Sequence, residues 1–230
     1  MKRAHWIGLL PYYLLTVIVI ICISLWGSRG VTVSVQNTPV ERYNTLIIDP
    51  GHGGIDGGAT SCTGVLESQI NLQIGLRLRD LMHLLGYHTV MTRTTDTSIH
   101  TQGNTIAAQK VSDLKNRVKL VEETPNAIYI GIHQNIFADS RYHGAQVFYG
   151  NEDESKTLAH IIQQKLCPAR QCKPGEGIYL LQNIHAPGVL VECGFLSNPA
   201  EEAKLRDAAY QKWLCAVIAE SLREFMSCSS

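Results

Sequence analysis

The fold is decided by residues 46–54, which read Leu-Ile-Ile-Asp-Pro-Gly-His-Gly-Gly. Three aliphatic residues followed by an aspartate and a glycine-rich loop are typical of a buried strand that ends at a functional loop. Two later segments repeat this pattern: residues 128–132 run into His133, and residues 189–191 run into Glu192. Apolar runs of this kind predict strands that are covered on both faces.

Amphipathic segments alternate with these apolar ones. We predict strands at residues 45–49, 88–92, 127–133, 145–149 and 189–192. Helices are predicted at residues 66–85, 111–123 and 152–166, and in the C-terminal segment, whose apolar stripe is Leu214, Val217, Ile218, Leu222 and Phe225. This alternation predicts an α/β fold, with a mostly parallel twisted sheet flanked by helices on both faces, in a single catalytic domain.

Composition excludes several classes of protein. The 230 residues include 20 Lys+Arg and 20 Asp+Glu, so the formal net charge is zero and no basic excess favours nucleic acid. An apolar content of 45% argues against a disordered chain. Seven cysteines are too few for a small disulfide-stabilised scaffold.

The N-terminal segment predicts a membrane anchor. Lys2 and Arg3 precede residues 6–26, of which 17 of 21 are apolar and none is charged. A helix of this length reaches about 30 Å, the thickness of the hydrocarbon core of a bilayer. We therefore predict a signal-anchor helix at 1–27, a stalk at 28–43 and a catalytic domain at 44–230, with the catalytic domain outside the cytoplasm. A cleaved signal peptide is the alternative, although the apolar run is long for one.

Four ionisable residues are expected at the carboxyl ends of the strands, where α/β folds place their sites. His52 and His133 follow strands, Glu67 opens the first long helix, and Glu192 ends the last strand. Two histidines and a glutamate form a common ligand set of catalytic zinc, and a further carboxylate is then needed for proton transfer. Taken singly, His52 suits a turn, Glu67 suits a helix N-terminus and His133 suits a core, whereas a buried Glu192 is costly without a function.

These residues lie in motifs that resemble a known family. The motifs are Asp-Pro-Gly-His-Gly-Gly at 49–54, Glu67, Gly-Ile-His-Gln-Asn at 131–135 and Val-Glu-Cys-Gly-Phe-Leu-Ser-Asn at 191–198. In this order they resemble the zinc-dependent N-acetylmuramoyl-L-alanine amidases of the type 3 catalytic family. The resemblance implies one Zn²⁺ held by His52, Glu67 and His133, with Glu192 as the catalytic carboxylate. It also implies peptidoglycan as the substrate, cut between muramic acid and the L-Ala of the stem peptide.

Within that family the chain is similar to the spore-cortex amidases of endospore-forming bacteria. This similarity implies a first step towards muramic-δ-lactam in the cortex, followed by a muramic acid deacetylase in the same pathway. It further implies a location in the space between the forespore and mother-cell membranes. An accessory activator protein is a further expected partner.

Several residues keep two interpretations. Asn135 and Arg93 are candidates for substrate binding or for support of the loops, and Asp49 is a candidate to orient a ligand histidine or to cap a turn. Cys193 is read as a buried inert thiol rather than a metal ligand, and Cys167 and Cys172 either form a disulfide or remain free. Two other functions also stay open: an inactive peptidoglycan-binding scaffold or activator, and a zinc hydrolase that cuts within the stem peptide.

Overall fold

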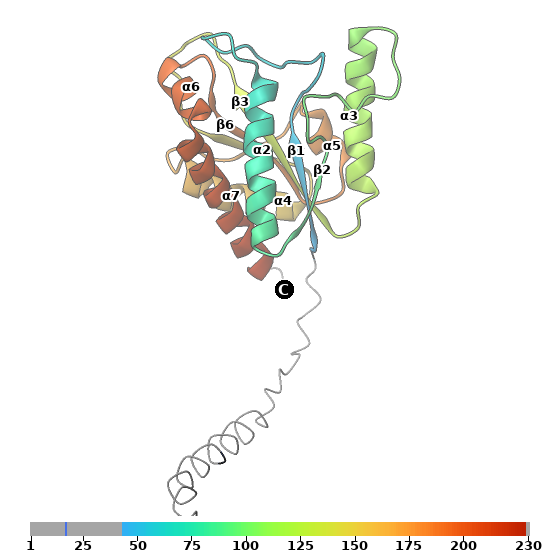
Figure 1. The fold of residues 1–230 in the computed structure, drawn as a ribbon, viewed down its shortest axis with the longest axis vertical. Coiled ribbons are helices and arrows are strands. Elements are labelled where there is room, and N and C mark those ends of the chain that lie inside the picture. Colours follow the sequence, from blue (N-terminus) through green and yellow to red (C-terminus); the bar gives the residue numbers. More distant parts are fainter. Residues whose placement is uncertain (1–16, 18–42, 229–230) are drawn as a thin grey trace, which may run out of the picture. The chain divides into compact units, whose positions relative to one another are not determined.

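The computed structural model describes residue 17 and residues 43–228, and a six-stranded sheet lies at the centre of the latter segment (Figure 1). Its strand order is β2-β1-β3-β6-β4-β5. The strands are β1 (Thr45–Pro50), β2 (His88–Met91), β3 (Ala127–Asn135), β4 (Gln146–Tyr149), β5 (Lys173–Pro174) and β6 (Gly188–Phe195). Neighbouring strands are parallel except β4 and β6, which confirms the prediction of a mostly parallel sheet.

Six helices are present in residues 43–228. They are α2 (Glu67–Leu84), α3 (Ile106–Glu122), α4 (Asp153–Leu166), α5 (Tyr179–Asn183), α6 (Pro199–Arg206) and α7 (Ala208–Cys228). Figure 1 shows α2 and α7 running side by side, with α3 set apart from them. The predicted helices at 66–85 and 152–166 agree with α2 and α4, and the C-terminal apolar stripe lies on α7.

Side chains of successive strand residues lie in two apolar layers, one on each face of the sheet. Ile48 and Ile130 lie in a core layer with residues of α2, α4 and α7, whereas Ile47 and Tyr129 lie in a layer with residues of α3 and α5. All four side chains are fully buried. Successive residues of a strand point to opposite faces, so helices cover the sheet on both sides, as the sequence predicted.

The start of α3 differs from the prediction. The helix begins at Ile106, five residues before the expected position 111, and the Thr105 side chain accepts a hydrogen bond from the Ala108 amide as its N-terminal cap. The first two turns of the helix carry exposed Ile106 and Val111, so they show no buried apolar stripe that would reveal the start of the helix. β5, α5 and α6 were not predicted.

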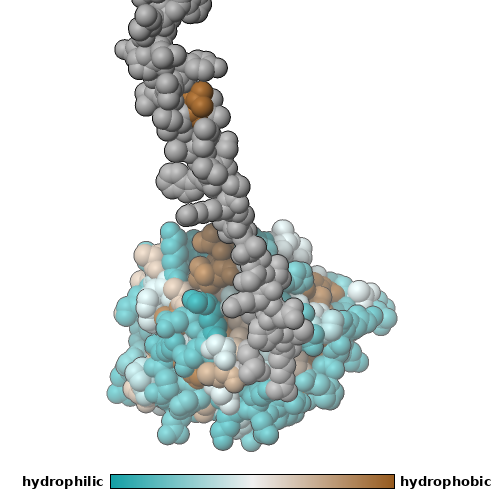
Figure 2. All heavy atoms as spheres, turned by 90° about the horizontal axis from the view of Figure 1, so that it is seen from below, coloured by the Kyte–Doolittle hydropathy of each residue, from teal (hydrophilic) through white to brown (hydrophobic). Residues whose placement is uncertain are grey.

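The predicted anchor and stalk lie outside the described residues, apart from Val17 and Tyr43. Among the described residues, no helix combines the length and apolar character that crossing a membrane requires. Figure 2 shows the face of the domain seen from below, where hydrophilic residues predominate around smaller hydrophobic patches.

Candidate metal centre

The loop after β1 places His52 in an unusual backbone conformation. The φ angle of His52 is 62°, in the left-handed region that few residues other than glycine adopt. Two hydrogen bonds hold the backbone of this loop. The Gly51 amide donates to the Ile132 carbonyl at 3.0 Å, and the side-chain Nη2 of Arg117 donates to the His52 carbonyl at 2.8 Å. The conformation turns the His52 ring towards the start of α2.

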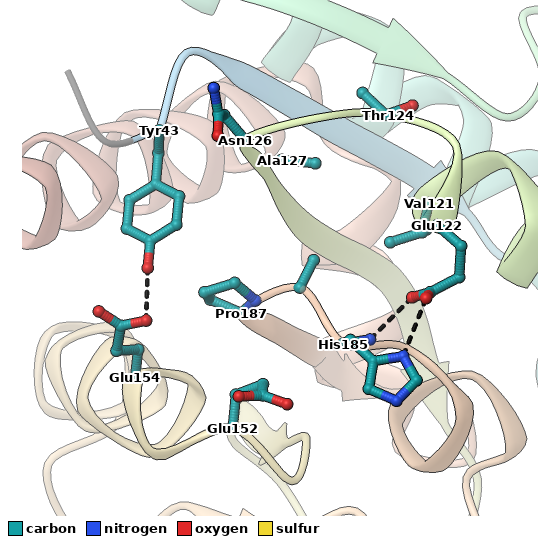
Figure 3. A pocket seen from close by; sticks show the side chains of 11 residues that line it. Tyr43, Val121, Glu122, Thr124, Asn126, Ala127, Glu152, Glu154, His185 and Pro187 are labelled. Atoms are coloured by element: carbon teal, nitrogen blue, oxygen red, sulfur yellow. Dashed lines mark hydrogen bonds and ion pairs between the residues drawn. The ribbon is translucent and has the colours of Figure 1, made fainter. Parts of the chain in front are cut away.

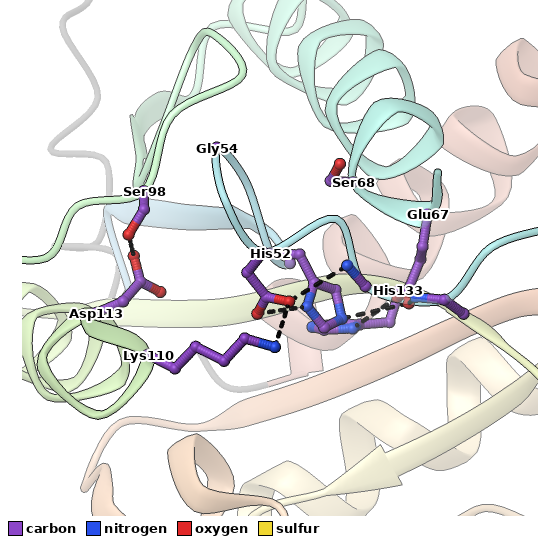
Figure 4. A network of polar contacts seen from close by, with 12 residues as sticks. His52, Gly54, Glu67, Ser68, Ser98, Lys110, Asp113 and His133 are labelled. Atoms are coloured by element: carbon purple, nitrogen blue, oxygen red, sulfur yellow. Dashed lines mark hydrogen bonds and ion pairs between the residues drawn. The ribbon is translucent and has the colours of Figure 1, made fainter. Parts of the chain in front are cut away.

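Glu67 lies between the two histidines. His52 Nε2 is 3.2 Å from Glu67 Oε2, and His133 Nδ1 is 3.0 Å from Glu67 Oε1. One ligand atom from each of the three residues lies within 4.8 Å of the other two. Figure 4 shows the three side chains pointing towards one another from the loop after β1, from α2 and from β3. The donor atoms suit a divalent transition metal of the zinc type.

A second layer of contacts fixes these side chains. The Ala59 and Gln134 amides donate to Glu67 at 2.9 and 3.1 Å. His52 Nδ1 lies 2.9 Å from Asp56 Oδ2, so its Nε2 is the nitrogen left to face Glu67. Such outer contacts orient metal ligands and fix histidine tautomers.

Two glycines leave room for the ligands. A Cβ at Gly51 would lie 2.1 Å from His133 Nε2, and a Cβ at Gly58 would lie 2.6 Å from Glu67 Oε2. Both positions therefore require glycine because the side chains of the centre occupy the space beside the backbone.

Electrostatics of the centre favour a bound cation. Burial alone would lower the pKa of His52, but hydrogen bonds and charge attraction from Glu67 and Asp56 raise this pKa to about 9. Burial would raise the pKa of Glu67, yet His133 and His52 hold it well below its usual range. The carboxylate thus keeps its charge and attracts positive charge, and a metal that bound there would displace the proton of His52.

Glu192 faces the centre from the neighbouring strand. It pairs in register with His133, because β3 and β6 are parallel neighbours. Its buried Oε2 has no hydrogen-bond partner among the described residues. Burial raises the pKa of Glu192 to about 7, which suits a group that gains and loses a proton near neutral pH.

Asp49 takes neither of the roles considered for it. Its buried carboxylate accepts hydrogen bonds from Thr92 Oγ1 and the Tyr129 hydroxyl, each at 2.6 Å, and forms an ion pair with Arg117. Burial opposes its charge, but the Arg117 guanidinium holds the pKa of Asp49 below its usual range. Asp49 therefore ties β1 to α3 and does not contact a ligand histidine.

The two predicted substrate contacts lie in different surroundings. Arg93 is buried and donates to the carbonyls of Pro50, Gly51, Ser68 and Thr95 at 2.8–3.1 Å. These bonds are those of a residue that supports the loops, one of the two roles open for Arg93. Asn135 ends β3, and its carbonyl accepts from the Leu196 amide, while its contact with substrate stays a prediction.

The cysteines of the described residues are all free thiols, so Cys167 and Cys172 form no disulfide here. Cys193 is fully buried, and burial raises the pKa of its thiol far above the usual range. A protonated buried thiol is unreactive, in agreement with the inert interpretation.

A separate hollow of about 380 Å³ lies at the amino ends of the strands, away from the metal centre (Figure 3). There His185 Nδ1 pairs with Glu122 at 2.8 Å, and the Tyr43 hydroxyl donates to Glu154. It contains none of the predicted site residues.

Comparison with known proteins identifies the family. A family model described as N-acetylmuramoyl-L-alanine amidase matches residues 46–224. The chain belongs to the N-acetylmuramoyl-L-alanine amidase family. It is therefore an amidohydrolase, and the predicted family resemblance is confirmed.

Individual relatives agree with this assignment. The germination-specific N-acetylmuramoyl-L-alanine amidase of Bacillus subtilis is 36% identical over 189 residues, which cover 79% of each chain. The structure of the CwlD amidase from Clostridioides difficile, solved in complex with the GerS lipoprotein, matches with a TM-score of 0.77 and 37% identity over 80% of this chain and 99% of that chain. The catalytic domain of the CwlV amidase from Bacillus (Paenibacillus) polymyxa matches with a TM-score of 0.69 and 28% identity, over 80% of this chain and 98% of that domain.

Sequence reasoning missed several residues of the centre. Asp56 and Gly58 lie four and six positions after His52 in the glycine-rich loop, and this proximity was the available signal. Arg117 gave no signal, because its contacts with the loop depend on how α3 packs on the sheet.

Proposed function

We propose that the chain is a zinc-dependent amidase that hydrolyses the amide between muramic acid and the L-Ala of the peptidoglycan stem peptide. The observation that carries this proposal is the cluster of His52, Glu67 and His133 at the carboxyl ends of the strands, with Glu192 on the adjacent strand. When bound, zinc would supply a Lewis acid for the scissile carbonyl and lower the pKa of water to about 7.

The protein groups around that position have distinct tasks. His52, Glu67 and His133 would hold the metal, and the contacts of Asp56 with His52 and of the Ala59 amide with Glu67 fix the direction of two of the three ligands. Glu192, with a pKa near 7, would take a proton from the attacking water and give it to the leaving amine nitrogen. Within residues 43–228, its Oε2 has no competing hydrogen bond that would hold it away from these atoms.

Digestion of purified peptidoglycan tests the chemistry. The purified protein is expected to contain one zinc per catalytic domain and to release intact stem peptides from an uncut glycan, as measured by mass spectrometry. Cuts within the stem peptide would indicate a different hydrolase. Binding to peptidoglycan with no released peptide would indicate a scaffold.

The biological role that we propose is in the spore cortex. The similarity to a germination-specific amidase of Bacillus subtilis, at 36% identity, supports this role. A deletion strain is then expected to make spores whose cortex lacks muramic-δ-lactam, because the deacetylase of the pathway would lack its substrate. Unchanged lactam content in these spores would refute the cortex role and leave the chemistry intact.

We also propose that the N-terminal segment anchors the protein in a membrane, with the catalytic domain outside the cytoplasm in the space between forespore and mother cell. The apolar run at residues 6–26 supports the anchor. An accessory activator is part of the proposal, and the complex of the C. difficile CwlD amidase with a lipoprotein supports it. Fractionation of sporulating cells tests the location.

A further inference from the structure

Two successive ion pairs connect helix α3 to the metal centre. Lys110 Nζ lies 2.8 Å from Asp56 Oδ1, and Asp56 Oδ2 lies 2.9 Å from His52 Nδ1. Asp56 therefore uses one oxygen for the helix and the other for the histidine. The Gly58 amide also donates to Asp56, at 3.3 Å.

The contact between Asp56 and His52 determines which nitrogen of His52 is free to bind a metal. A histidine that donates its Nδ1 hydrogen to a carboxylate keeps Nε2 unprotonated when it binds a metal, and its ring cannot rotate without losing that bond. In the structure Nε2 is the atom that faces Glu67, at 3.2 Å. Asp56 is therefore placed to direct the donor atom of His52 towards the metal position.

The same helix also holds the backbone of His52. Arg117 Nη2 donates to the His52 carbonyl at 2.8 Å, and Arg117 is itself fixed by Asp113 at 2.6 Å and by Asp49. The left-handed φ of His52 costs energy for a residue with a Cβ, so it needs such support. Helix α3 thus constrains both the ring and the backbone of one ligand.

We propose that Asp56 and Lys110 are positioning residues for His52, and that α3 in this way sets the affinity of the centre for zinc. The inference rests on the proposed zinc-dependent function. Lys110 acts through Asp56, and Asp56 acts through His52. The half-exposed Lys110 can be replaced without opening the core, because its side chain is 49% exposed.

The test measures zinc affinity and ligand geometry in the full chain. Four variants are compared with the unmodified protein: Asp56→Asn, Lys110→Met, the double variant, and Lys115→Met as a control. Lys115 is an exposed lysine of the same helix, so its loss changes the charge of α3 equally. Zinc dissociation constants are measured by competition with a coloured chelator, and the visible spectrum of the Co²⁺-loaded protein reports ligand geometry.

We expect Asp56→Asn to weaken zinc binding about 10- to 100-fold and to alter the Co²⁺ spectrum. Lys110→Met should weaken binding about two- to fivefold, as for a solvent-exposed ion pair, and Lys115→Met should not. Because Lys110 acts through Asp56, the double variant should bind zinc no more weakly than Asp56→Asn alone.

Several results would overturn the inference. Equal effects of Lys110→Met and Lys115→Met, or additive effects in the double variant, would show that Lys110 does not act through Asp56. A raised KM with unchanged zinc affinity in Lys110→Met would assign this lysine to the substrate. Failure of the unmodified protein to bind zinc would refute both proposals, whereas tight zinc binding without hydrolysis of the muramoyl amide would refute only the proposed function.

Discussion

The charge state of a single carboxyl group governs the proposed chemistry. Glu192 lies beside His133, and one of its buried oxygens has no hydrogen bond to any residue that the structure describes. We expect Glu192→Gln to lower kcat by about 10²–10⁴-fold, the usual contribution of a positioned proton-transfer group. Zinc content should be unchanged, because Glu192 is not one of the three ligands. Amide hydrolysis on purified muropeptides and metal analysis of the same sample check both statements, and full activity of the variant would contradict the assignment.

The same carboxyl group should make stability depend on pH. Burial raises the pKa of Glu192 to about 7 from an ordinary value of 4.5. The folded protein then holds a proton that the unfolded chain releases, so stability from this group is present below pH 4.5 and is lost as the pH rises through about 7. In metal-free protein, Glu192→Gln should therefore gain stability relative to the unmodified chain across this range. Urea unfolding at several pH values measures the difference, and a difference that does not vary with pH would contradict the prediction.

A comparison of Gly58→Ala with Gly64→Ala tests whether a side chain fits beside the metal ligands. An alanine Cβ at Gly58 would meet Glu67 Oε2 at 2.6 Å and His52 Cδ2 at 2.7 Å, and the φ of Gly58 is 69°. Gly64 has a similar φ of 90°, and a Cβ placed there would have no atom of the described residues within 4 Å, so Gly64→Ala carries the backbone strain alone. In both variants the free energy of unfolding should fall by about 1–2 kcal/mol because of that strain. Only Gly58→Ala should also lose zinc binding, measured by chelator competition; retained binding would show that the ligands can shift.

These residues mark what sequence can and cannot predict of a site. His52, His133 and Glu192 were predictable, because each follows or ends an apolar strand at the end where sites form, and Glu67 was predictable because it opens the first long helix. The need for glycine at positions 51 and 58 was not predictable, because the side chains that fill the space come from distant parts of the chain. Arg93 likewise could not be assigned, since an arginine that binds four carbonyls looks the same in sequence as one that binds a ligand.

At the scale of elements, a buried ion pair joins α3 to the sheet. Asp49 of β1 and Arg117 of α3 are both almost fully buried and pair with each other. Asp49→Asn should lower the free energy of unfolding by about 3–5 kcal/mol, because Arg117 loses a buried counter-charge. The control is Asp139→Asn, which removes the partner of Arg141 at the surface and should cause no measurable change. Urea unfolding measures both variants, and an equal decrease in the free energy of unfolding for Asp49→Asn and Asp139→Asn would contradict a structural role for the buried pair.

Element boundaries were predicted well where packing and capping agree. Helix α2 ends at Leu84, one residue from the predicted end at 85, and Gly86, with a φ of 87°, follows the C-terminal cap. The short helix α6 was missed although Asn198 accepts hydrogen bonds from the Ala200 and Glu201 amides and Pro199 opens the helix. Asn198 is the last residue of the motif at 191–198, so it was interpreted as part of that motif. The eight residues of α6 are too few to show the apolar periodicity of a helix.

At the scale of the whole molecule, location and catalysis are expected to be separable. The family match covers residues 46–224, and every predicted site residue lies within it. A fragment of residues 44–230 should keep its zinc and hydrolyse muropeptides at the rate of the full chain, but move from the membrane fraction to the soluble fraction. Immunoblots and activity measurements on fractionated cells check this, and a full-length protein that is already soluble would contradict the anchor.

The three residues of the metal centre come from a loop, a helix and a strand that are distant in the chain, with Glu67 and His133 separated by 66 positions. They meet only after β1 has paired with β3 and α2 has packed on the sheet. A polypeptide in transit across a membrane has no such pairing and therefore no assembled ligand set. Under the proposed location outside the cytoplasm, the protein would therefore bind zinc only once it has folded beyond the membrane.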